Sequence, residues 1–124
     1  MSLLQHLRLY HGNWMLKKAE LNELFAGRPK LLFTVYPLGN VINGRPMIAN
    51  TLVKDTLTCF PGTEDAVSLV EFYKQIFHYR ILFPNDLAIY FDTNPYKFYP
   101  AELIYVDEIE ACRDFLSNPF TIVV

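Results

Sequence analysis

Apolar side chains recur at helical spacing in three stretches of the chain. Steps of three and four residues over 3–11, 15–26 and 64–77 are typical of helices that bury one face. The third stretch has the broadest apolar stripe, formed by Leu69, Phe72, Tyr73, Ile76 and Phe77. Glu64 and Asp65 stand at its expected start, where the helix dipole favours negative charge. Spacing alone does not separate rings that pack in a core from rings that line a pocket.

Between these helices the pattern changes to β-branched and aromatic runs, which are typical of strands. Strands are expected at 31–36, 47–53, 56–60, 79–83, 87–91 and about 102–107. Asn43-Gly44 is the strongest hairpin signal and predicts a turn that joins the first two strands; 92–95 is expected to be another turn. The tail, which ends in PFTIVV, is expected to add a short helix and an edge strand. This order predicts an α+β fold, with a small barrel or sandwich favoured over a doubly wound sheet.

Composition narrows the class of protein. With 124 residues, 52% of them hydrophobic and 19% charged, the chain is expected to be one globular domain or a fragment of a longer protein. It has no apolar run near the roughly 20 residues that span a bilayer, and its first residues lack the pattern of a signal peptide. We therefore expect no membrane partner and an intracellular location, cytoplasmic or nuclear. The net charge of −2 argues against a broad electrostatic interface with a nucleic-acid duplex. It does not exclude a small pocket that binds one nucleotide.

Motifs for catalysis and cofactor binding are absent. The sequence contains no GxxxxGK[ST], GxGxxG, GxSxG or HExxH. Its three histidines are scattered, and His6 and His11 are five residues apart, which does not place them on one helix face for a metal. Acids such as Asp86 and Asp92 are more simply turn residues than a hydrolytic pair. We expect no enzyme activity, no metal and no cofactor.

A family resemblance emerges in the second half of the chain. Residues 59–108, CFPGTEDAVSLVEFYKQIFHYRILFPNDLAIYFDTNPYKFYPAELIYVDE, resemble the PAZ domain of Argonaute and Piwi proteins. The shared order is a strand end at Phe60, a helix with an EFYKQIF core, the FP of Phe83-Pro84, and FYPAEL at 98–103. Upstream, GRPKLLFTVYPLGNVINGRPMIANTLV is similar to the family's first hairpin. The resemblance covers about residues 20–110.

This resemblance implies both a fold and a function. The fold would be an OB-like β-barrel with a β-hairpin-plus-helix appendage, spanning 29–124, with a helical segment at 1–28 packed on it. PAZ domains hold the 3′ end of single-stranded small RNA between barrel and appendage, without catalysis, in proteins of RNA-mediated gene silencing. A single-stranded end offers unstacked bases to aromatic rings and a terminal sugar and phosphate to polar donors. A separate protein or the neighbouring Argonaute domains would be the protein partners.

The resemblance also implies which residues bind RNA. Phe60 matches the ring that stacks on the last base. Phe72 and Phe77 fall where the family usually places two tyrosines that reach the terminal phosphodiester. The family's hairpin histidine falls near Tyr36 or Pro37. Arg45 is what remains of the hairpin's basic residues.

Near the end of the expected barrel, Lys97, Phe98 and Tyr99 occupy the stretch that flanks the terminal sugar. Tyr73 and Ile76, with Leu69, are expected to pack in the core, and Trp14 is expected to anchor the N-terminal segment. Two alternatives stay open. A degenerate PAZ-like domain that has lost its tyrosine and lysine donors would accept an apolar protein segment. A Dicer-type PAZ domain is also compatible, since FPG followed by EFYK echoes that group.

Overall fold

The structure is a computed model that describes residues 1–107, 113 and 116, and its N-terminal part is helical as the periodicity predicts. Helix α1 (Leu3–Tyr10) is followed by the 3₁₀ turn η1 (Trp14–Lys17) and helix α2 (Lys18–Ala26). Ser2 caps α1: its hydroxyl accepts from the Gln5 N–H at 3.2 Å, and the Gln5 side chain accepts from the Ser2 N–H at 2.7 Å. This pair of bonds fixes where the first helix begins.

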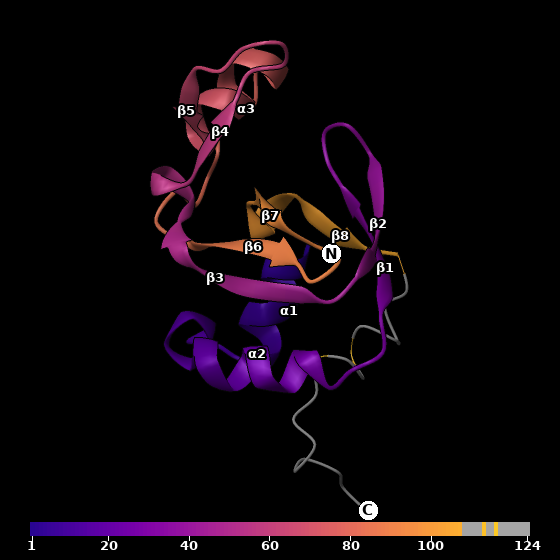
Figure 1. The fold of residues 1–124 in the computed structure, drawn as a ribbon. Helices are drawn as coiled ribbons and strands as arrows, with labels where there is room; N and C mark the ends of the chain where they lie inside the picture. The colour runs from indigo at the N-terminus through magenta and orange to yellow at the C-terminus, as the bar shows by residue number, and fades with distance from the viewer. Residues whose placement is uncertain (108–112, 114–115, 117–124) are drawn as a thin grey trace, which may run out of the picture.

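The strands of the described chain form three antiparallel sheets (Figure 1). One has the order β2-β1-β8, with β1 at Leu31–Val35, β2 at Asn40–Gly44 and β8 at Ile104–Val106. Another has the order β3-β6-β7, with β3 at Pro46–Leu52, β6 at Leu87–Phe91 and β7 at Asn94–Tyr99. The third pairs β4 (Leu57–Cys59) with β5 (Ala66–Ser68). The fold is mixed α+β, but its sheets do not close into the expected barrel.

The first hairpin forms between different strands than the sequence predicts. Strand β1 pairs with β2 through a turn at 36–39, in which Gly39 has a φ of 76°. Asn43-Gly44 lies inside β2, and β3 pairs with β6 instead. Gly44 is needed for close approach, because a Cβ there would lie 2.9 Å from Thr93 Oγ1 and 3.2 Å from Asp92 Oδ1. The predicted turn at Asn43-Gly44 is therefore wrong: the glycine marks a close approach of β2 to the turn between β6 and β7.

Three other predicted boundaries also differ. Helix α3 (Leu69–Phe77) begins five residues later than expected, because 66–68 pair with β4 and Ser68 becomes its N-cap. Residues 79–83 form no strand. The turn at 92–95 shortens to 92–93, since β7 begins at Asn94 and tolerates its proline as an edge strand. The expected helix and strand of the tail lie largely outside the described residues.

Two hydrophobic clusters hold these elements together. The larger one joins the N-terminal helices to both three-stranded sheets and contains Trp14, Phe25, Phe33, Phe91 and Ile104. Trp14 is therefore the anchor that the sequence predicts, with 2% of its surface exposed. Asn22 of α2 bonds the outer edge of β3, accepting from the Ile48 N–H at 2.7 Å and donating to its carbonyl at 2.9 Å.

The second cluster connects the sheets to a smaller unit, which we call the appendage: β4, β5 and α3, residues 57–77. In Figure 1 the appendage stands away from the N-terminal helices, across from the tip of the β1–β2 hairpin. Leu69 and Tyr73 of α3 are buried in this cluster together with Val53, Ile81 and Leu103. Ile76 was expected in the core but is 42% exposed. We call the rest of the described chain the body.

Candidate functional site

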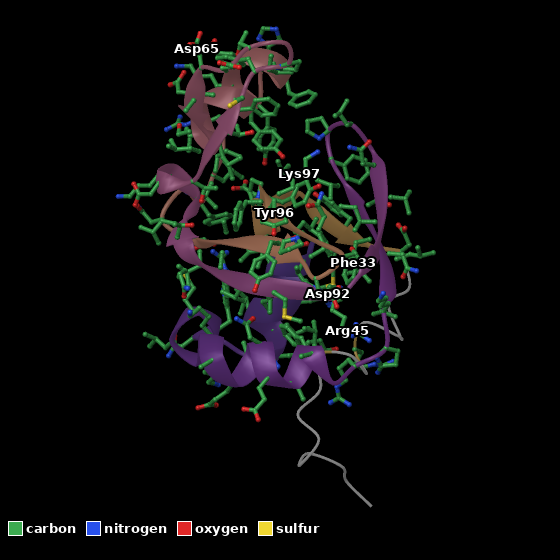
Figure 2. The ribbon with its side chains drawn as sticks, viewed as in Figure 1. Phe33, Arg45, Asp65, Asp92, Tyr96 and Lys97 are labelled. Carbon is green, nitrogen blue, oxygen red and sulfur yellow. The ribbon has the colours of Figure 1, made fainter. Side chains whose placement is uncertain are left out.

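A cavity of about 120 Å³ lies where the appendage, the β1–β2 hairpin and β7 meet. The hairpin contributes 35–38 and Asn40, and β4 contributes Leu57 and Thr58. From α3 come Leu69, Phe72, Tyr73 and Phe77. From β7 come residues 96–99. Figure 2 shows Tyr96 and Lys97 in the space between the hairpin and the appendage. Segments from four parts of the sequence thus build one site.

Six of the eight predicted RNA-binding residues line this cavity: Tyr36, Phe72, Phe77, Lys97, Phe98 and Tyr99. A seventh, Phe60, lies next to it, because its ring is stacked on that of Phe72 with 6.2 Å between the centroids. The Phe72 ring in turn packs edge-on against Tyr73 at 5.5 Å and Phe77 at 6.0 Å. Phe60 therefore supports the cavity wall through its contact with Phe72.

Arg45, the eighth predicted residue, does not line the cavity. Its guanidinium lies 2.8 Å from Asp92 Oδ2 and also donates to the Arg28 carbonyl, and Figure 2 shows it beside Asp92, below Lys97. The Asp92 carboxylate also accepts from the Arg45 N–H at 2.9 Å. Burial acts to raise the pKa of Asp92, but these bonds from Arg45 outweigh it and lower the pKa. Arg45 joins β3 to the β6–β7 turn.

The lining is rich in rings and poor in charge. Among the described residues that line the cavity, seven are aromatic and Lys97 is the single charged one. The Lys97 ammonium lies 5.6 Å from the centroid of the Tyr99 ring. A planar ligand with one negative charge matches this combination, because rings stack on planar groups and the ammonium attracts an anion.

Two buried phenols complete the lining. Burial raises the pKa of Tyr73, and the nearby Tyr99 adds to that effect. Burial also raises the pKa of Tyr99 itself. Both hydroxyls therefore stay protonated at neutral pH and are neutral hydrogen-bond groups. They lie in the same cavity as Phe72 and Phe77, which lack hydroxyls.

The sequence alone missed part of this site. Tyr73 was assigned only to the core, yet it is both buried and on the cavity wall. Tyr96 was not predicted as a site residue, but it lies in β7 and is 90% exposed at the cavity rim. Leu38 of the hairpin turn and Leu57 of β4 also line the cavity and are exposed apolar residues. A strand prediction through Asn94 would have placed Tyr96 and Phe98 on one face.

The described part of the chain offers no other chemistry of comparable specificity. Within it, no three His, Cys, Asp or Glu side chains are grouped as a metal site would need. None of its helices has the length and apolar character to cross a bilayer. Searches of family models, curated proteins and solved structures found no match to this chain.

Proposed function

We propose that this chain is a PAZ-like domain that binds the 3′ end of single-stranded small RNA in its aromatic cavity, without catalysis. The observation that carries the proposal is the cavity itself: seven rings and one ammonium between an appendage and the body. The resemblance of 59–108 to PAZ domains leads to the same ligand from the sequence. The β4–β5–α3 unit supports it as the expected hairpin-plus-helix appendage.

The cavity suits one nucleotide end rather than a length of duplex. Stacking of a base on an aromatic side chain is worth about 1–3 kcal/mol and does not depend on base identity. Tyr73 and Tyr99 provide neutral hydroxyls for the terminal sugar, and Lys97 provides a cation for one phosphate. The family's usual phosphate-binding tyrosines are Phe72 and Phe77 here, so the phosphate contacts are fewer and stacking carries more of the affinity.

The test is a titration with 5′-labelled single-stranded RNA followed by fluorescence anisotropy. RNA with a free 3′ hydroxyl should bind, and the same RNA with a 3′-phosphate should bind at least tenfold more weakly. Equal binding of the two, or no binding of either, would refute the proposal. Phe60→Ala should weaken binding of the free end, because it removes the ring that is stacked on Phe72 and supports that part of the cavity wall. Tyr10→Ala, an exposed ring on α1, is the matched control and should change nothing.

A second candidate is a protein-interaction module that accepts an apolar peptide segment. The exposed apolar rim favours it, since Leu38 is 68% exposed and Leu57 is 65% exposed. Contiguous exposed apolar patches mark protein-interaction sites and ligand-binding grooves. A peptide that binds with the same affinity to wild type and to Lys97→Met, while RNA ends do not bind, would favour this candidate.

A further inference from the structure

The one-turn helix η3 (Ala101–Leu103) follows β7 and is connected both to the β1–β2 hairpin and to α3. It directly follows β7, whose residues 96–99 line the cavity. On the hairpin side, the Leu103 carbonyl accepts from the Tyr36 N–H at 2.9 Å. On the appendage side, Leu103 packs in the same cluster as Leu69 and Tyr73 of α3. The cavity walls are therefore joined through this turn.

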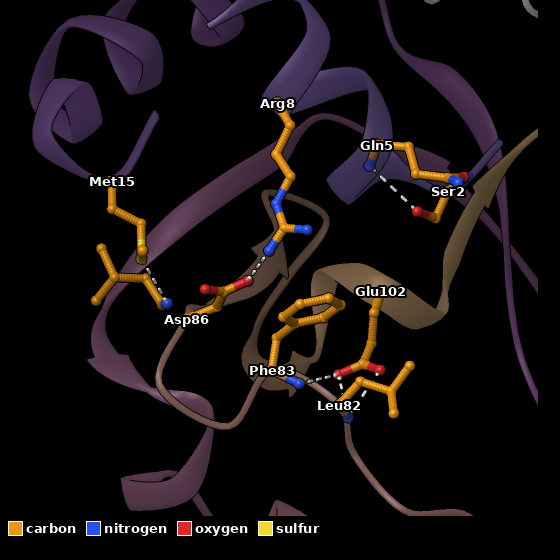
Figure 3. A network of polar contacts seen from close by, with 9 residues as sticks. Ser2, Gln5, Arg8, Met15, Leu82, Phe83, Asp86 and Glu102 are labelled. Atoms are coloured by element: carbon orange, nitrogen blue, oxygen red, sulfur yellow. Dashed lines mark hydrogen bonds and ion pairs between the residues drawn. The ribbon is translucent and has the colours of Figure 1, made fainter. Parts of the chain in front are cut away.

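The side chain of Glu102 makes a further connection from this turn. It is buried, and its carboxylate accepts from the Tyr79 hydroxyl at 2.9 Å and from the N–H groups of Leu82 and Phe83 at 3.0 and 3.1 Å. Figure 3 shows the carboxylate against the backbone of Leu82 and Phe83. These donors belong to the segment that leads out of α3, so Glu102 fixes the exit of the appendage to η3.

The two connections between appendage and body are also bonded to each other. The Val53 N–H donates to the Asp86 carbonyl at 2.8 Å, and the Lys54 N–H donates to the Pro84 carbonyl at 3.0 Å. From α1, the Arg8 guanidinium lies 3.8 Å from the Asp86 carboxylate and 4.1 Å from the centroid of the Phe83 ring. Figure 3 shows Arg8 reaching Asp86 on the far side of Phe83 from Glu102. The loop at 79–86 is thus held from two sides.

We propose that Glu102 is a positioning residue that sets the spacing between the appendage and the β1–β2 hairpin, and so the affinity of the cavity for its ligand. The affinity part rests on the proposed RNA function; the spacing part does not. Without the carboxylate, three donors at the exit of α3 lose their acceptor, and the appendage is free to take several orientations. A cavity that is assembled in only a fraction of molecules binds its ligand more weakly by that fraction.

The spacing is measurable without any ligand. Cys59 is a free, exposed thiol in the appendage, and Val41 of the hairpin is 64% exposed. Nitroxide labels on Cys59 and on a Val41→Cys variant, with Cys112→Ser to leave two thiols, report the distance across the cavity by pulsed electron resonance. We expect one narrow distribution in this background, a broad one after Glu102→Ala, and a narrow one again in Glu102→Gln. The glutamine oxygen still accepts from Leu82 and Phe83, and its amide donates to the Tyr79 oxygen.

Affinity for the RNA end should follow the spacing. Glu102→Ala should weaken it on the order of tenfold, and Glu102→Gln should restore it. Glu64→Ala, an exposed acid of the appendage, is the control and should alter neither readout. An unchanged distance distribution in a folded Glu102→Ala protein would overturn the proposal. If circular dichroism shows that Glu102→Ala does not fold, Tyr79→Phe decides, because it removes one bond to Glu102 and keeps the ring: broadening supports the proposal and an unchanged distribution overturns it.

If wild type binds no RNA, the distance measurement still stands and only the proposed function fails. If RNA binds wild type and Glu102→Ala equally while the distribution broadens, the link between spacing and affinity is refuted and the RNA function remains.

Discussion

The single cation of the cavity lining leads to a quantitative prediction about salt. Lys97 is exposed, and it is the one charged group among the described lining residues. For single-stranded nucleic acid, each phosphate that a protein neutralises contributes about −0.7 to the slope of log K against log salt. One contact therefore predicts a slope of about −0.7, so that raising salt from 50 to 200 mM weakens binding only about 2.6-fold. Most of the affinity should persist at high salt, because stacking does not release counterions.

Lys97→Met tests this reasoning directly. It keeps an unbranched apolar stem and removes the charge, so the slope should fall to near zero, and its affinity should approach that of wild type as salt rises. Lys74→Met is the matched control, since Lys74 is an exposed lysine of α3 that does not line the cavity. The assay is the anisotropy titration with free 3′ ends, repeated at four or five salt concentrations. A wild-type slope steeper than about −2, or an unchanged slope in Lys97→Met, would show that cations outside this lining bind the RNA.

Three further predictions concern groups that the structure places outside the cavity. Replacing Asn22 by Ala leaves the buried N–H and carbonyl of Ile48 unpaired, so the free energy of unfolding in urea should fall by about 2–4 kcal/mol; a loss below 1 kcal/mol would contradict the edge contact. Burial and the bond to a carboxylate raise the pKa of Tyr79 to about 12, so its stabilising contribution is complete below pH 10 and is lost as pH rises through 12. In alkaline unfolding experiments, the free energy of unfolding of Tyr79→Phe should not show this loss of the Tyr79 contribution. Arg45→Met should leave RNA-end affinity within about twofold but lower stability at neutral pH by about 1–3 kcal/mol. That deficit should shrink as pH falls through the lowered pKa of Asp92, and a constant deficit in acid titrations would refute the ion pair's role.

The helices could be predicted from sequence because their signals are local. Apolar spacing gives the periodicity of α1, α2 and α3, and the Ser2 cap and Gln5 lie within one turn of each other. Strand pairing could not be predicted in the same way. The choice between β2 and β3 as the partner of β1 depends on β6, which lies about forty residues further along the chain.

The strand predicted at 79–83 does not form, for a specific physical reason. Its composition favours a strand, and the N–H groups of Leu82 and Phe83 do find acceptors. The acceptor is the Glu102 carboxylate rather than the carbonyls of a neighbouring strand. Strand propensity indicates that these backbone N–H groups need hydrogen-bond acceptors. It does not indicate that the acceptor is a side chain twenty residues away.

The candidate site was predicted from the resemblance and not from periodicity. Helical spacing placed Phe72 and Tyr73 on one broad apolar stripe, and could not show that both line the same cavity. Tyr96 escaped notice because it follows the expected turn at 92–95 and no strand was predicted there. Exposed aromatic residues on edge strands carry little sequence signal, because neither burial nor pairing constrains them.

In the proposed RNA complex, the low charge of the cavity would favour a chain end over the interior of an RNA strand. An internal nucleotide has a phosphate on both sides, whereas a 3′-terminal nucleotide with a free hydroxyl has one. Lys97 can neutralise one of these charges, and the other described groups of the lining are aromatic, aliphatic or neutral polar. A second phosphate in this apolar surrounding would be desolvated without a charged partner, at a cost of several kcal/mol. Selection for the end then arises from exclusion of the second charge, more than from recognition of the hydroxyl, and this is why a 3′-phosphate is the most informative block.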